Sequence, residues 1–464
     1  MNNKLSRYWL LLGVTALAIA GLFSLVLVMA RTPTLSSIPL FNDIFHKSLV
    51  VHVDLSVLVW FLSIACLMWS LGVQGLRQVF PYLEEAALIC CALGTLLIAV
   101  SPLDPKGVAL MSNYIPVITS PLFFLGLSLL LCGVMLMLVH VILSAGRKAV
   151  VEGSYATEKD PSAPLRFAQD DGIKFALYSS VFIALIAVMA FLWSYRQMPP
   201  VISGEQYYDL LFWGGGHVLQ LLHVQIVMIV WLMLAKALKP EFYVYKPHLY
   251  ALFAVGVASS FCVPWAYLHY RVDDPGHRLF FTYLMILAGG IAPTILALWI
   301  LPGLITFRHL RHGDKRALYS ALFMSFVLFI YGGVLGALIE GQNVVIPAHY
   351  HGSIVGVTLA FMGMAYLLLP QFGWRDVRAW KLAFWQPIVY GGGQLLHISG
   401  LAWSGGYGVL RKTPGGLEGV SASVKAAMGL MGVGGLLAII GGFMFVVVVG
   451  KAIIARNVSD EVIH

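Results

Sequence analysis

Long apolar runs fill almost the whole of this 464-residue chain, and they constrain its fold more than any other feature. Hydrophobic residues make up 59% of the chain and charged residues only 11%, whereas a soluble domain carries about a quarter charged residues. A helix needs about 20 apolar residues to cross a bilayer. The sequence therefore predicts an all-α integral membrane protein. Its net charge of +8 is assigned to loops that flank the membrane rather than to nucleic-acid binding.

Twelve of the runs are long enough to cross a membrane. They predict one twelve-helix membrane domain over residues 1–464. The first run is interpreted as a retained helix, because it is too long for a signal peptide and lacks a small-residue cleavage site. The predicted spans are residues 8–30, 49–72, 84–102, 115–145, 174–196, 206–238, 247–271, 278–306, 317–341, 348–370, 380–403 and 424–450.

Basic residues predict the orientation of these spans. If both termini are cytoplasmic, the connections after even-numbered spans are cytoplasmic too, and they hold most of the 29 Lys and Arg residues. The positive-inside rule favours this topology, and we expect a bacterial-type inner (cytoplasmic) membrane. The five cysteines lie in apolar runs and none forms a CxxCH motif, so neither covalently attached heme nor disulfides are expected.

Five histidines from four spans fall in the outer half of the membrane in this topology. Ionisable groups at such depth are costly and usually functional. His349 and His351 open the tenth span and differ by about 200° in azimuth on a helix, so they face opposite sides and can bind two different metals. Histidine is the usual axial ligand of a non-covalent heme. The five residues are His52, His217, His269, His349 and His351.

The stretch IPAHYHGSIVGVTLAFMGMAYLLLP, the GGGH motif in the sixth span and the stretch HYRVDDPG after the seventh occur within this twelve-span frame. Together they resemble the catalytic subunit of the heme-copper oxidase superfamily (the cytochrome c oxidase subunit I family), nearest its ba-type oxidase and NO reductase branches. The resemblance implies that His52 and His351 hold a low-spin heme and that His349 holds a high-spin heme. It also implies that Arg411 and Lys412 bind heme propionates through charge pairing.

The resemblance further implies one more metal, copper or iron, beside the high-spin heme. In the family it is bound by a histidine of the sixth span, here His217, and by an adjacent histidine pair after the seventh. This chain has only His269 at the pair position, so His269 is a predicted ligand and the third ligand stays open. The candidates are Gln220, on nearly the same helix face as His217, and also His223 and His277.

A second departure concerns the chemistry. Most oxygen reductases of the family carry a tyrosine four residues after the sixth-span histidine, and here that residue is Leu221. Tyr270 is the candidate for a replacement redox partner. Coupling two NO molecules to N2O needs two electrons and two protons and no O–O cleavage. The missing tyrosine therefore favours an oxidoreductase that reduces NO, with reduction of O2 to water as the alternative.

Electrons must come from a partner, and we expect a membrane-anchored copper protein or a c-type cytochrome. Two other interpretations stay open. One is a proton-coupled transporter whose histidines relay protons, although the absence of short discontinuous spans argues against it. The other is a di-heme electron-transfer protein in which the second-metal site is degraded.

Overall fold

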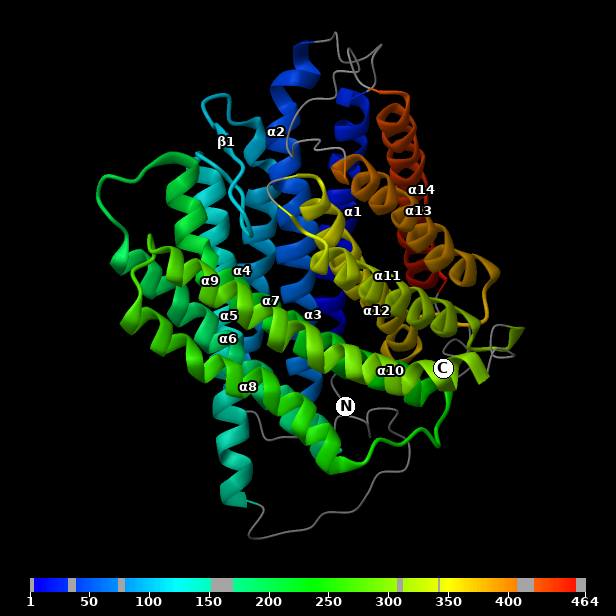
Figure 1. Ribbon diagram of the computed structural model, residues 1–464. Coiled ribbons are helices and arrows are strands. Elements are labelled where there is room, and N and C mark those ends of the chain that lie inside the picture. Colours follow the sequence, from blue (N-terminus) through cyan, green and yellow to red (C-terminus); the bar gives the residue numbers. More distant parts are fainter. Residues whose placement is uncertain are drawn as a thin grey trace. The chain divides into compact units, whose positions relative to one another are not determined.

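The computed structural model describes residues 4–31, 39–73, 80–151, 170–306, 312–340, 343–406 and 421–455, and within these ranges the chain is almost entirely helical (Figure 1). This confirms the predicted all-α membrane fold. The segments up to residue 306 are α1 (Lys4–Arg31), α2 (Pro39–Val53), η1 (Asp54–Val59), α3 (Trp60–Gly72), α4 (Pro81–Val100), η2 (Ser101–Leu103), β1 (Ala109–Leu110), β2 (Val117–Ile118), α5 (Pro121–Val151), α6 (Asp171–Gln197), α7 (Gly204–Leu238), α8 (Lys246–His269), α9 (Pro275–Leu284), η4 (Met285–Gly289) and α10 (Gly290–Thr306). The later segments are α11 (Arg316–Ala337), α12 (Val345–Leu368), η6 (Pro370–Phe372), α13 (Lys381–Gly406) and α14 (Ala422–Ile454).

Each predicted span corresponds to one helix or to helices that continue through a π-helical turn. The second span consists of α2, η1 and α3, and the eighth consists of α9, η4 and α10. Among the described residues, eleven helical stretches are long and apolar enough to cross a membrane. The predicted span 380–403 is the helix α13, which is not one of the eleven. It carries Gln386, Gln394 and His397 in its interior, which makes it more polar than the others.

The fourth span begins later than predicted. We expected residues 115–145, but α5 begins at Pro121 and the residues before it form an antiparallel hairpin in which Ala109 pairs with Ile118 (Figure 1). The segment IPVITS is apolar and rich in β-branched residues. Hydropathy does not distinguish such an extended segment from the start of a helix. The hairpin matters because it carries Tyr114.

The chain divides into two compact units. One contains residues 1–30, 34–229 and 244–293, and the other contains residues 31–33, 230–243 and 294–464. In the second unit, α11 packs along α12, and α13 packs along α14 (Figure 1, orange and red). His217 belongs to the first unit, whereas His349 and His351 belong to the second.

The contact between α4 and α5 in the first unit is unusually close. A Cβ atom on Gly133 of α5 would lie 2.5 Å from Sγ of Cys91 and 2.6 Å from the carbonyl oxygen of Ala87. Near one end of this contact lie two buried ionisable side chains, with Nε2 of His140 3.7 Å from Oε2 of Glu84. A buried carboxyl group and a buried imidazole stabilise each other by pairing, because the membrane interior supplies no water to solvate them.

We expect Gly133→Ala to destabilise the protein by about 1–3 kcal/mol, because the added methyl group meets backbone that cannot move aside. Gly432→Ala on α14 is the matched control. It has open space around it and should gain up to about 1 kcal/mol of helix propensity. The measurement is the thermal unfolding midpoint in detergent. Equal midpoints for the two variants would contradict the close α4–α5 contact.

Candidate functional site

Three consecutive glycines precede His217 on α7, and each makes room for an aromatic side chain. A Cβ atom on Gly214 would collide with the hydroxyl group of Tyr267, one on Gly215 with the ring of Phe191, and one on Gly216 with the ring of Tyr114. Only glycine permits such an approach, because any side chain would occupy the space of the ring. The GGG run therefore brings two tyrosines close to the helix that carries His217.

The imidazole of His217 is buried, and both of its nitrogens have partners. Nδ1 lies 2.7 Å from the carbonyl oxygen of Trp213, one turn earlier. A carbonyl oxygen can only accept, so Nδ1 carries the proton and Nε2 carries the lone pair. The hydroxyl group of Tyr114 lies 2.8 Å from Nε2 and is its donor. A metal ligand is commonly oriented in this way by a hydrogen bond to its other nitrogen.

Tyr114 is the site residue that sequence reasoning missed. It lies at the turn of the β1–β2 hairpin with φ of 66°, and it is the one non-glycine residue with positive φ among the described residues. This backbone conformation is strained for a tyrosine, and strain of this kind clusters at functional sites. Burial raises the pKa of Tyr114, which keeps the phenol protonated and able to donate. The GGG run before His217 was the available signal that a bulky side chain packs against this part of α7.

The other predicted residues near His217 take different positions. His269 is exposed at the end of α8, where Nδ1 donates to the carbonyl oxygen of Trp265 at 2.8 Å and the two rings stack at 4.3 Å. Gln220 and Tyr270 are half-buried. Leu221 is buried. The structure therefore does not bring His269 into the buried surroundings of His217.

The two histidines of α12 face different neighbouring helices, as their spacing predicts. Nδ1 of His349 donates to the carbonyl oxygen of Gly332 on α11 at 2.7 Å. The ring of His351 instead contacts His397 of α13, with 5.6 Å between ring centroids and nearly perpendicular planes. Nδ1 of His397 in turn donates to the carbonyl oxygen of Met431 on α14 at 2.9 Å. A helix that carries imidazoles on opposite sides can hold two bound groups, one on each side.

His52 is half-buried near the end of α2, directly before the π-helical turn η1. Its Nδ1 donates to the carbonyl oxygen of Ala20 on α1 at 2.9 Å. π-helical turns inside helices are frequent at functional sites. His52, His217 and His349 thus share one arrangement, in which a carbonyl oxygen holds the Nδ1 proton and the lone pair lies on Nε2. That tautomer and orientation fit axial ligation of a heme or a metal.

The structure describes no geometry for two of the predictions, the propionate-binding pair and the complete ligand set of a further metal. Arg411 and Lys412 lie outside the described residues. Among the residues that the structure does describe, no three or more His, Cys, Asp or Glu side chains are grouped so as to hold a metal ion.

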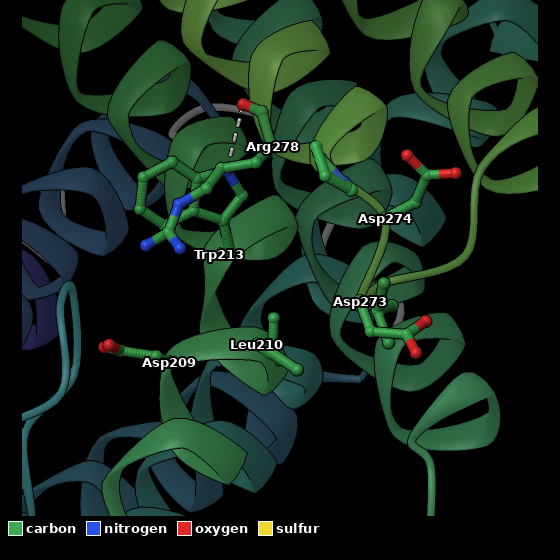
Figure 2. Close-up of a pocket in the computed structure, with 8 residues that line it drawn as sticks. Asp209, Leu210, Trp213, Asp273, Asp274 and Arg278 are labelled. Carbon is green, nitrogen blue, oxygen red and sulfur yellow. Dashed lines mark hydrogen bonds between the residues drawn. The ribbon is translucent and has the colours of Figure 1, made fainter. Parts of the chain in front are cut away.

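A cavity of about 160 Å³ lies one turn before His217 on α7, lined by polar and apolar side chains. Figure 2 shows the guanidinium group of Arg278 over the ring of Trp213, whose Nε1 donates to the carbonyl oxygen of Arg278 at 3.3 Å. Asp209 on α7 accepts a hydrogen bond from the backbone of Asn113, beside Tyr114. Two residues of the cavity wall thus contact the site. Trp213 accepts a hydrogen bond from His217, and Asp209 accepts one from Asn113 of the hairpin.

Comparison with known proteins places the chain in a family. The family model described as cytochrome C and quinol oxidase polypeptide I matches residues 4–444. The chain belongs to this family. It is therefore a catalytic subunit of the heme-copper oxidase superfamily, an oxidoreductase and an integral membrane protein. Members of the family normally bind hemes and a copper or iron centre.

The chain is also similar to individual proteins. The chain is 30% identical to an uncharacterised protein of Rickettsia prowazekii, covering 97% of this chain and 96% of that protein. It is 27% identical to an uncharacterised protein of Aquifex aeolicus, covering 79% of this chain and 85% of the relative. A solved structure of a heme-copper terminal oxidase dimer has the same fold, with a TM-score of 0.74 and 19% identity over 99% of this chain and 85% of that one.

The hairpin that carries Tyr114 is held by Asp104. The hydroxyl group of Ser120 donates to one carboxylate oxygen at 2.6 Å and the backbone N–H of Lys106 to the other at 3.0 Å. These hydrogen bonds, that of Ser120 first, lower the pKa of Asp104. A carboxyl group whose pKa is lowered on folding stabilises the fold above its ordinary pKa of about 3.9, and the contribution is lost as the pH falls through the lower folded value.

We therefore expect the advantage of the native protein over Asp104→Asn to be present at pH 5–7 and to shrink as the pH falls below about 4. The measurement is the thermal unfolding midpoint of both proteins from pH 7 to pH 3. Curves that stay parallel over this range would show that the carboxylate does not hold the hairpin.

Proposed function

We propose that this subunit passes electrons from a low-spin heme to a high-spin heme and a further metal, where a diatomic gas is reduced, and that the gas is NO. His52 and His351 would hold the low-spin heme, His349 the high-spin heme, and His217 the further metal. The bound groups supply electron storage and a site where the gas is polarised. Carbonyl oxygens orient the imidazoles of His52, His217 and His349, and α12 would separate the two hemes.

The observation that carries the choice of NO is Leu221. This side chain is 1% exposed and lies one helical turn after His217, where oxygen reductases of the family place a tyrosine. A leucine supplies neither an electron nor a proton. The reaction 2 NO + 2 e⁻ + 2 H⁺ → N2O + H2O takes both electrons from the donor, so it has no need of a redox-active side chain at this position.

Tyr114 favours a second candidate, the reduction of O2 to water. Its hydroxyl group touches the same histidine from the β1–β2 hairpin, so a phenol is present beside His217 although it comes from another part of the chain. The role that the sequence assigned to Tyr270 would then belong to Tyr114. Tyr270 is half-buried and packs against Gly276 and Trp265.

The electron donor and the orientation are part of the same proposal. A membrane-anchored copper protein or a c-type cytochrome would dock on the outer side, nearest the low-spin heme. The protein would lie in a bacterial inner membrane with both termini in the cytoplasm. Protons would reach the site through buried polar groups, because charged carriers do not cross lipid unaided.

Gas specificity is tested on the purified complex with one artificial electron donor. We expect rapid N2O formation from NO under anaerobic conditions and oxygen uptake at least tenfold slower. Leu221→Tyr should not raise the rate of N2O formation. Fast oxygen uptake that is lost in Tyr114→Phe would instead establish the second candidate.

Replacing the proposed heme ligands should change the optical spectrum selectively. His52→Ala and His351→Ala should each remove the low-spin signal, because a single remaining imidazole leaves the iron five-coordinate or empty. His349→Ala should spare that signal and alter the high-spin bands. His248→Ala is the control, because His248 is exposed in the first turn of α8. Unchanged spectra in all three ligand variants would refute the proposed heme assignment.

A further inference from the structure

His277 is a buried histidine, and both of its ring nitrogens need a hydrogen-bond or metal partner. It lies in the first turn of α9 with 0% exposure, and neither ring nitrogen has a hydrogen-bond partner among the described residues. Leaving a buried polar group without a partner is expensive, and nearly all such groups in native proteins have one. A buried imidazole with both nitrogens unsatisfied therefore indicates that a bound group completes its surroundings.

The start of α9 determines why this histidine points inward. Asp274 caps the helix by accepting a hydrogen bond from the N–H of Gly276 at 2.7 Å, and Pro275 occupies the first helical position. A cap and a proline at these positions define where a helix begins. The turn DDPGH after α8 thus reverses the chain and places His277 in the interior of the first unit.

His277 and His217 share the same buried surroundings. Both rings contact Phe281, at centroid distances of 4.8 Å for His277 and 6.0 Å for His217. Tyr267 packs edge-on against His277 at 5.0 Å, and its hydroxyl group contacts Gly214, one turn before His217.

His269 offers the opposite surroundings. It is exposed, its Nδ1 is bonded within its own helix, and its ring lies flat on that of Trp265. If His269 binds no metal, none of its nitrogens is left buried without a hydrogen-bond partner. The residue at the family's expected position is thus turned away from the interior, whereas a histidine eight residues further along the chain is turned into it.

We propose that His277, and not His269, is the second imidazole ligand of the metal bound by His217. This inference rests on the proposed function and identifies the residues that hold its metal. Imidazole donors suit copper and iron alike. Tyr114 donates to Nε2 of His217 at 2.8 Å, so its hydroxyl oxygen lies beside the nitrogen that would hold the metal. In place of the family's histidine pair after α8, this chain would then use the single imidazole of His277, which lies eight residues after His269.

The test measures metal and heme content per protein in purified complexes of His277→Phe, His277→Cys and His269→Ala. We expect His277→Phe to retain both hemes and lose at least nine-tenths of the non-heme copper or iron. His277→Cys should retain a substantial part of it through its thiolate, and X-ray absorption should show a sulfur ligand. His269→Ala should keep the metal.

Full metal content in His277→Phe, or loss of the metal in His269→Ala, would overturn the inference. If His277→Phe fails to assemble, the absorption spectrum of His277→Cys decides, because only a ligand position acquires a metal–sulfur bond. A native complex that holds two hemes and no further metal would refute the proposed function itself. A native complex with metal and N2O formation, beside an unaffected His277→Phe, would refute the ligand assignment alone.

Discussion

A membrane interior gives polar groups no water, and this constraint explains how the buried histidines of the protein are held. Backbone groups are satisfied within helices, but a buried imidazole has two nitrogens to satisfy. In this chain the carbonyl oxygens of Ala20, Trp213 and Gly332 each accept a proton from a histidine Nδ1. The same bond satisfies one nitrogen and orients the other. Histidines that lipid would otherwise exclude thus become oriented donors.

Close approach of helices and rings is the second requirement. Glycine at position 133 lets α4 and α5 touch at their backbones, and glycines 214 to 216 let Tyr267, Phe191 and Tyr114 reach the helix that carries His217. In lipid, helix association depends on packing and hydrogen bonds rather than on the hydrophobic effect. The same small residues therefore stabilise the fold and shape the surroundings of the site.

Much of the architecture was predictable because a span leaves a simple signal. Twelve apolar runs became twelve helical stretches, and the azimuths of His349 and His351 followed from helix geometry alone. The start of the fourth span was wrong, because an apolar β-branched segment before Pro121 has the hydropathy of a helix and the conformation of a strand. Tyr114 lies in the connection before the predicted span and was missed, because it meets His217 only through the tertiary structure.

The sequence by itself determined the membrane class, the positions of most helical stretches and the opposed faces of His349 and His351, because periodicity and hydropathy are properties of neighbouring residues. Only the tertiary structure decided which polar groups meet. It turned His269 outward and His277 inward, and it brought Tyr114 to His217 across 103 positions of chain. Such meetings depend on how helices pack and where a turn is capped. Those contacts join residues distant in the chain, and no local pattern contains them.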